Sequence, residues 1–305
     1  MSPSPAPMGT APSLALFIGG AHKAGTTALY QMLAQHPELA GHAQSELTFF
    51  AEDEEYAHGF DSRAWRRYLP AQLGARRFVG KHVKLFYRRE ALARLRAHAS
   101  EVRLVLVLRH PVERAYSAFW HARALGREEL ARFEDGLASE DARVAAGRPA
   151  WHDTAYVRNG LYARALSDAF ETFGRERVRV FLLEDLRARP LELARELYAA
   201  LAVDAAFRPD LERGANRASA ARSPGLARLM GGVFDSRALP KRAVRALLPD
   251  RVAVALRAGF VRWNTRPFAP PPLAAETRAA LLARFRESNA RVAELLGRDL
   301  AHWDR

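Results

Sequence analysis

Residues 14–29 read LALFIGGAHKAGTTAL: an apolar stretch, a loop with glycines and the start of a helix. The loop from Gly20 to Thr27 keeps the G-x-x-x-x-G spacing of a nucleotide-binding P-loop, which holds phosphate with backbone N–H groups at a helix N-terminus. An NTPase loop carries Lys directly after its second glycine, but Thr26 stands there in this chain. Lys23 lies earlier, at the crown of the loop. The stretch therefore predicts a phosphate site in which Lys23 points at a different part of the ligand from the part that the Lys of an NTPase loop contacts.

Lysine is rare in this chain, since only four of its 47 basic residues are Lys: Lys23, Lys81, Lys84 and Lys241. Lys is a compact charge that can give up its proton, whereas Arg is a planar fork that stays protonated. The other basic residues are all Arg, so the chain has a bias toward Arg. A site that must protonate a leaving oxygen would keep Lys in spite of that bias. The pattern favours a functional Lys23, and the alternative is that these lysines are only solvated charges.

Length and composition limit the possible classes. The 305 residues are 49% hydrophobic, which is enough for a sizeable core. A net charge of +13 suits an anionic ligand, but the arginines form no long basic run, which argues against nucleic acid. The chain has no Cys, which excludes disulfides and thiolate metal sites.

The N-terminal residues 1–12 are rich in Pro and Ala and are predicted to be a flexible tail before one domain over residues 13–305. The apolar run that follows is too short to span a membrane. We expect no stable membrane insertion and a cytoplasmic protein. The sequence does not indicate an oligomeric state.

Apolar stretches alternate with helical patterns along the chain. Such alternation predicts an α/β fold, a single domain with a central parallel sheet flanked by helices. After the first strand, further strands are expected at 77–83, 102–108 and 178–183, and helices at 26–35, 89–99, 159–173 and 276–296, with others starting at Pro111 and Pro190. Ligands in such folds bind at the carboxyl ends of strands, where Lys23, Lys81 and Arg109 fall.

Several motifs resemble the family of sulfotransferases that use 3′-phosphoadenosine 5′-phosphosulfate (PAPS). The resemblance covers about residues 13–303 and points to a soluble, bacterial-type member of the heparan sulfate N-/3-O-sulfotransferase-like branch. The strongest motifs are FIGGAHKAGTTALYQMLAQHPEL, similar to the 5′-phosphosulfate loop, and LVLVLRHPVERAYSAFWH, similar to the 3′-phosphate motif. The segments SELTFF, VGKHVKLF, GLYARALSDAF, VFLLEDL and RFRESNARVAELLGRDLAHW also fit.

This resemblance implies transfer of a sulfuryl group from PAPS to a hydroxyl or amine (EC 2.8.2.-), leaving adenosine 3′,5′-bisphosphate (PAP). It assigns Lys23 to the leaving oxygen, where a preorganised cation stabilises developing charge. It assigns Glu46 as the base that takes the acceptor proton, and Lys81 to the sulfuryl group. The implied cofactor-binding residues are Lys23, Ala24, Gly25, Thr26, Thr27, Arg109, Ser117 and Arg222. No metal is expected, because no His, Asp or Glu spacing suggests a metal site.

The acceptor is predicted only as a class: a glycan, a lipid or a small molecule. Many relatives have Lys directly before the motif Glu and an acidic residue after the paired Phe, whereas this chain has Ser45 and Ala51. These differences fall on the acceptor side of the predicted site and leave the cofactor side unchanged. The sequence therefore predicts the sulfuryl donor more firmly than its acceptor.

Other interpretations of the same residues stay open. A P-loop small-molecule kinase would need Lys after Gly25 and an Asp for Mg²⁺. A non-catalytic protein that binds nucleotides or polyanions would tolerate the loss of Glu46 and Lys23 chemistry. If the chain is an enzyme with another base, His42 and His22 are the candidates.

Overall fold

The computed structural model describes residues 14–70, 76–149, 152–212, 219–221, 259–260 and 263–305. These residues group into two compact units. The first comprises the described residues up to His110, residues 161–212 and Glu287–His302. The second comprises Pro111–Gly160, the described residues from 219 to Arg286, and Trp303–Arg305.

The first unit is built on a five-stranded parallel sheet, as the alternating pattern predicts. The spatial order is β2-β3-β1-β4-β5, and the strands are β1 (Leu14–Gly20), β2 (Leu39–Gly41), β3 (Arg77–Lys81), β4 (Arg103–Leu108) and β5 (Val178–Leu182). Strand β2 was not expected from the sequence, because three residues are too few to show a periodic pattern.

Strand β1 lies at the centre of this sheet, between β3 and β4. Its residue Ile18 pairs with Lys81 on one side and Val105 on the other. Both β1 and β4 are almost entirely buried, because a parallel sheet is covered on both faces. The loop after β1 therefore emerges between the carboxyl ends of two neighbouring strands.

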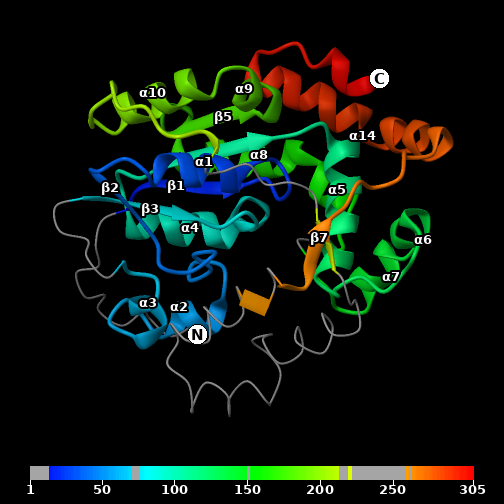
Figure 1. The fold of residues 1–305 in the computed structure, drawn as a ribbon, viewed down its shortest axis with the longest axis horizontal. Coiled ribbons are helices and arrows are strands. Elements are labelled where there is room, and N and C mark those ends of the chain that lie inside the picture. Colours follow the sequence, from blue (N-terminus) through cyan, green and yellow to red (C-terminus); the bar gives the residue numbers. More distant parts are fainter. Residues whose placement is uncertain (1–13, 71–75, 150–151, 213–218, 222–258, 261–262) are drawn as a thin grey trace. The chain divides into compact units, whose positions relative to one another are not determined.

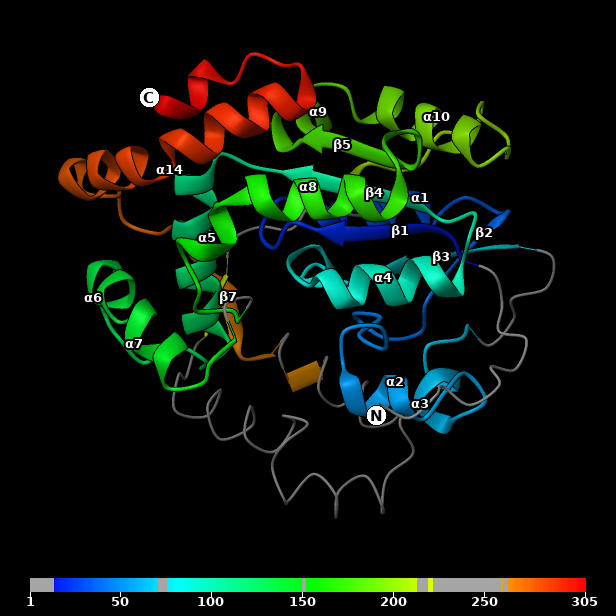
Figure 2. The same cartoon turned by 180° about the vertical axis from the view of Figure 1, so that it is seen from behind.

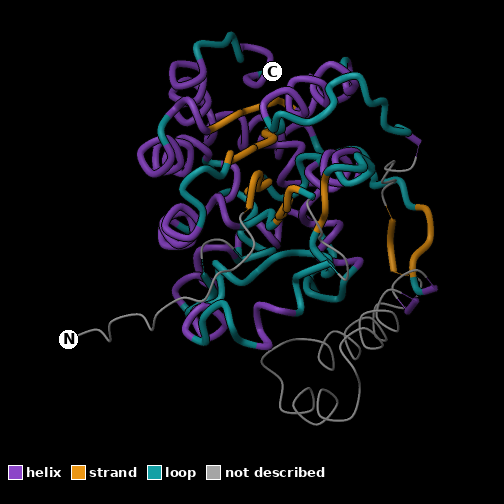
Figure 3. The backbone as a smooth tube through the Cα atoms, turned by 90° about the vertical axis from the view of Figure 1, so that its left-hand side faces the viewer, coloured by secondary structure: helices purple, strands orange, loops and turns teal. Residues whose placement is uncertain are grey.

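Helices cover both faces of this sheet. Figure 1 shows α1 on one face, and Figure 2 shows α4 and α8 on the opposite face; the tube in Figure 3 shows helices on either side of the strands. The helices of this unit are α1 (Thr26–Leu33), α2 (Asp53–Ala57), α3 (Arg63–Arg66), α4 (Arg89–His98), α8 (Tyr162–Phe173), α9 (Leu183–Ala188) and α10 (Pro190–Ala200). The short α9 was missed, because only the helix that begins at Pro190 has a clear start signal.

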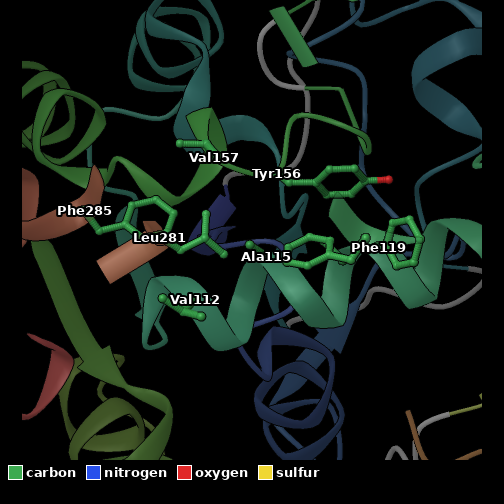
Figure 4. Packing of buried hydrophobic residues seen from close by; sticks show 9 residues of the cluster. Val112, Ala115, Phe119, Tyr156, Val157, Leu281 and Phe285 are labelled. Carbon is green, nitrogen blue, oxygen red and sulfur yellow. The ribbon is translucent and has the colours of Figure 1, made fainter. Parts of the chain in front are cut away.

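The second unit packs around helix α5. Its elements are α5 (Pro111–Ala124), α6 (Phe133–Ala138), α7 (Glu140–Ala145), β6 (Ser219–Ala221) and β7 (Thr265–Pro267), and α14 (Ala275–Leu296) contributes to both units. Figure 4 shows its core, in which apolar residues of α5 meet Tyr156, Val157, Leu281 and Phe285. The Phe119 and Tyr156 rings pack edge to face at 5.8 Å. This core fixes α5, the helix that carries Ser117.

The described part of the chain contains no helix that has both the length and the apolar character needed to cross a bilayer.

Candidate active site

The loop between β1 and α1 has the compact form that a phosphate site requires. The Ala21 N–H donates to the Val107 carbonyl at 2.7 Å, and the Ala24 N–H donates to Ala21 at 3.2 Å. Lys23 lies at the crown in the left-handed region, with φ of 67°. Such a backbone costs a non-glycine residue on the order of 1–3 kcal/mol. The loop is thus bonded to the neighbouring strand and holds its lysine in an uncommon conformation.

Gly25 ends the loop and caps α1. Its φ is 89°, which glycine adopts without a steric penalty. The following N–H groups at the start of α1 have no partner within the helix, and a helix N-terminus attracts anions. Ala24 and Thr26 are buried beside these groups, and Thr27 is partly exposed. The predicted phosphate-binding residues 24–27 therefore occupy one helix start.

Gly25→Ala should lower the free energy of unfolding by about 2–4 kcal/mol, which combines backbone strain with overpacking. A Cβ at Gly25 would lie 2.7 Å from Leu183 Cδ1 and 3.3 Å from Leu186 Cδ2. Urea denaturation measures the loss. Gly59→Ala is the matched control, because Gly59 also has a positive φ, 73°, but its Cβ would meet no atom within 4 Å. Equal losses in the two variants would show that contact with α9 is unimportant.

Glu46 and Lys81 form an ion pair at the carboxyl end of β3. Lys81 is only 2% exposed, and its Nζ bonds to Glu46 Oε1. Glu46 Oε2 accepts from the Val83 N–H at 3.0 Å, and the Leu47 N–H donates to the Lys81 carbonyl at 2.7 Å. The Glu46 side chain keeps 28% exposure. The carboxylate is therefore held by two donors, and the side chain as a whole is still partly exposed.

Burial raises the pKa of Glu46 above its ordinary value, and the bonds from Lys81 and Val83 oppose this rise without cancelling it. Lys84 also lowers the pKa of this carboxyl by its charge. Burial disfavours the charged form of an acid, so ionised Glu46 is a stronger base than a surface Glu.

His42 and Tyr30 lie beside the ion pair. The two rings stack with centroids 4.7 Å apart, and Lys81 Nζ lies 5.8 Å from the centroid of the Tyr30 ring. Burial, assisted by the charge of Lys81, lowers the pKa of His42 to about 3. The imidazole is therefore neutral near pH 7 and a weaker base than Glu46. This comparison favours Glu46 over His42 as a proton acceptor.

Tyr30 is a site neighbour that the sequence did not single out. Its hydroxyl donates to the His42 carbonyl at 3.3 Å. A Cβ at Gly41 would lie only 2.2 Å from the Tyr30 hydroxyl oxygen, so the glycine that ends β2 permits this approach. Gly41 is the one sequence feature that could have indicated this contact. In the sequence, however, a glycine at this position looks the same as a glycine in an ordinary turn.

His82 is buried between the two lysines of this strand end. Burial, followed by the charges of Lys84 and Lys81, lowers its pKa to about 3. The residue lies directly between Lys81 and Val83 in sequence, and its N–H donates to the Ile18 carbonyl at 3.0 Å. The charges of Lys81 and Lys84 therefore act on His82 as well as on Glu46.

Arg109, which follows β4, contacts the phosphate loop. Its Nη1 donates to the Lys23 carbonyl at 3.2 Å, and its own carbonyl accepts from the Tyr162 hydroxyl at 2.9 Å. The structure thus brings together Lys23 and Arg109 as the strand order requires. Ser117 lies on α5 in the second unit, and its role stays a prediction. Arg222 lies outside the described residues.

Among the described residues, no group of three or more His, Asp or Glu side chains is placed to hold a metal ion.

Comparison with known proteins identifies the family. A family model described as "Sulfotransferase domain" matches residues 15–205. A bifunctional heparan sulfate N-deacetylase/N-sulfotransferase of Drosophila melanogaster is 27% identical over 200 residues, covering 58% of this chain and 18% of that protein. Human heparan sulfate glucosamine 3-O-sulfotransferase 6 is 33% identical over 156 residues, covering 49% and 40%. This chain thus spans less than half the length of these relatives.

The fold is also similar to a solved structure. A sulfotransferase from Alicyclobacillus acidocaldarius matches with a TM-score of 0.69 and 23% identity, over 97% of this chain and 100% of that one. The match confirms the predicted α/β fold.

Proposed function

This chain belongs to the sulfotransferase domain family, and from that membership we propose that it transfers a sulfuryl group from PAPS to a hydroxyl or amine acceptor. The observation that carries the proposal is the juxtaposition at the ends of two paired strands. The loop after β1 carries Lys23 and the helix N-terminus, and the end of β3 carries the Glu46–Lys81 pair. The end of β1 offers hydrogen-bond donors for a phosphosulfate, and the end of the neighbouring strand β3 offers a carboxylate base.

The donor set fits PAPS. The N–H groups that open α1 and the Lys23 ammonium suit the 5′-phosphosulfate. The Arg109 guanidinium suits a phosphate because Arg can bond to two oxygens at once, and together with Ser117 it would hold the 3′-phosphate. Arg222 is proposed as a further cofactor contact. The reaction needs no metal in this proposal, since cations already meet the developing charge.

In the proposed reaction, the acceptor oxygen or nitrogen attacks sulfur while the bond from sulfur to the bridging oxygen breaks. Glu46 takes the acceptor proton, and the electron pair of the broken bond stays on the 5′-phosphate oxygen of PAP. Lys23 stabilises this leaving oxygen by donating a hydrogen bond or a proton. The raised pKa of Glu46 helps it accept a proton during the attack.

Lys81 is proposed to act at the sulfuryl group, as the resemblance implies. Its bond to Glu46 adds a second contribution, because a cation beside a carboxylate favours the ionised form that a base requires. Through this bond Lys81 also holds Glu46 in place.

The acceptor is proposed to be a glycan, a lipid or a small molecule. The two relatives described above are named for heparan sulfate, but this chain has Ser45 and Ala51 on the acceptor side. A kinase is disfavoured because Thr26 stands where NTP-binding loops carry Lys.

Binding of PAP should exceed binding of AMP by about 10- to 100-fold, because AMP lacks the 3′-phosphate and a charge-assisted contact contributes about 1.5–3 kcal/mol. Arg109→Ala should remove most of this preference and change AMP binding much less. Calorimetry with both nucleotides, without added Mg²⁺, measures these affinities.

Arg103→Ala is the matched control. Arg103 begins the same strand β4 at its opposite end and donates to the Ala200 carbonyl at 2.9 Å, so its loss should leave the preference for PAP intact. Equal affinity of the unmodified chain for the two nucleotides, or tight ATP binding that requires Mg²⁺, would overturn the proposed donor. Mass spectrometry of an acceptor panel incubated with PAPS then identifies the sulfated product.

A further inference from the structure

Two hydrogen bonds connect the crown of the phosphate loop to the start of α8. Arg109 Nη1 donates to the Lys23 carbonyl at 3.2 Å, and the Tyr162 hydroxyl donates to the Arg109 carbonyl at 2.9 Å. Lys23 and Arg109 are 86 residues apart, and Arg109 and Tyr162 are 53 apart. Three distant segments of the first unit therefore meet in one connected group, here named the Lys23 clamp.

The Lys23 end of the clamp acts on backbone geometry. Lys23 has a positive φ of 67°, a conformation that a non-glycine residue keeps only where its surroundings enforce it. A bond from a charged guanidinium to the Lys23 carbonyl is stronger than one between neutral groups. Because the backbone dihedrals of Lys23 set the direction of its Cα–Cβ bond, this bond also restricts the region that the ammonium can reach.

The Tyr162 end of the clamp is rigid. Tyr162 is fully buried and is the first residue of α8. Its ring lies 6.3 Å from the Phe86 ring, and Phe86 packs so closely on Gly20 that a Cβ there would lie 2.7 Å from Phe86 Cβ. Tyr162 thus bonds to Arg109 through its hydroxyl, and its ring lies beside Phe86, which packs on the start of the loop at Gly20.

We propose that Arg109 and Tyr162 are positioning residues for Lys23: Arg109 fixes the backbone of the lysine, and Tyr162 fixes the backbone of Arg109. This inference rests on the proposed function, in which Lys23 acts on the leaving oxygen. It is separate from 3′-phosphate binding, because both bonds of the clamp end on backbone carbonyls, those of Lys23 and Arg109.

Tyr162→Phe tests the clamp, because it deletes one hydroxyl and keeps the ring. Loss of one such bond should reduce kcat with PAPS about 5- to 10-fold while the affinity for PAP stays within about twofold. Tyr198→Phe is the matched control: Tyr198 is equally buried, and its hydroxyl also donates to a backbone carbonyl of the first unit, that of Met32 at 3.2 Å. The control should keep full turnover.

A second measurement is independent of catalysis. The chain has only four lysines, so protein labelled with ¹³C at the lysine Cε gives four NMR signals, and Lys23→Arg identifies that of Lys23. Tyr162→Phe and Arg109→Ala should shift or split the Lys23 signal without nucleotide, whereas Tyr198→Phe should not.

A Lys23 signal unchanged by both clamp variants, or equal turnover of Tyr162→Phe and Tyr198→Phe, would overturn the clamp. Failure of the proposed function would give a different result from failure of the clamp. The unmodified chain would then not prefer PAP to AMP, while the NMR signal of Lys23 would still report on the clamp.

A sulfuryl donor without a 3′-phosphate separates the two contributions of Arg109. Adenosine 5′-phosphosulfate cannot make the 3′-phosphate contact, so any loss of kcat in Arg109→Ala with this donor reports on the clamp. We expect a decrease of at least about fivefold. An effect of Arg109→Ala confined to the KM for PAPS, with unchanged turnover of adenosine 5′-phosphosulfate, would remove Arg109 from the clamp.

Discussion

Glu46→Gln should lower kcat by about 10²- to 10⁴-fold, the contribution of a well-placed general base. Gln is nearly the same shape, but it cannot take the acceptor proton. Its single carbonyl oxygen replaces only one of the two carboxylate oxygens that accept from Lys81 and Val83. The affinity for PAP should stay within a few-fold, because Glu46 belongs to the acceptor side. Steady-state sulfate transfer and calorimetry measure the two quantities on the same preparation.

Glu55→Gln provides the control for this variant. Glu55 is a partly buried carboxylate that pairs with Arg67 and accepts from the Tyr68 hydroxyl at 2.6 Å, yet it has no proposed role in catalysis. Its amide variant should keep turnover within a few-fold. Normal turnover of Glu46→Gln would assign the base to another residue.

The pH dependence follows from the same residue. Protonated Glu46 cannot accept a proton, so kcat should fall as the pH drops through the pKa of this carboxyl, which lies above its ordinary 4.5. Lys81→Met removes a charge that holds this pKa down, so the acid limb should move to higher pH. An acid limb at the same pH in both proteins would contradict a titrating Glu46.

Lys23→Ala should reduce turnover by about 10²- to 10³-fold, the effect of losing one preorganised donor at a developing charge. Lys23→Arg should recover little, because Arg does not give up its proton at neutral pH and its planar fork differs in shape. Single-turnover kinetics with bound PAPS measure the chemical step. Full activity of Lys23→Arg would exclude proton donation by this residue.

The sequence predicted the longer strands and helices of the fold well. The apolar runs of β1 and β4 and the loop between β1 and α1 have local signals, and the family model confirms the resemblance that they carry. The strands at 77–81 and 178–182 and the helices at 89–98 and 275–296 also lie within a few residues of their predicted positions. Long elements with strong patterns are the ones that local sequence determines.

The contacts around the site were less predictable, because they join residues that are far apart in sequence. The pairing of Lys81 with Glu46 depends on the route of the chain from β2 to β3, and the stacking of Tyr30 on His42 depends on the sheet order. No spacing rule encodes such contacts. The two positions on the acceptor side where the family pattern changes, Ser45 and Ala51, gave no indication of what now surrounds Glu46.

The central position of β1 has a consequence for the order in which the chain is made. The loop after β1 is synthesised before both strands that flank β1, and Leu183 and Leu186, which pack on Gly25, are synthesised later still. Contacts of such wide sequence separation form slowly because the intervening chain must first be ordered. A nascent chain that ends before α9 therefore carries every residue of this loop but lacks the leucines that lie against Gly25, so we expect the loop to reach its final conformation only after α9 has been made.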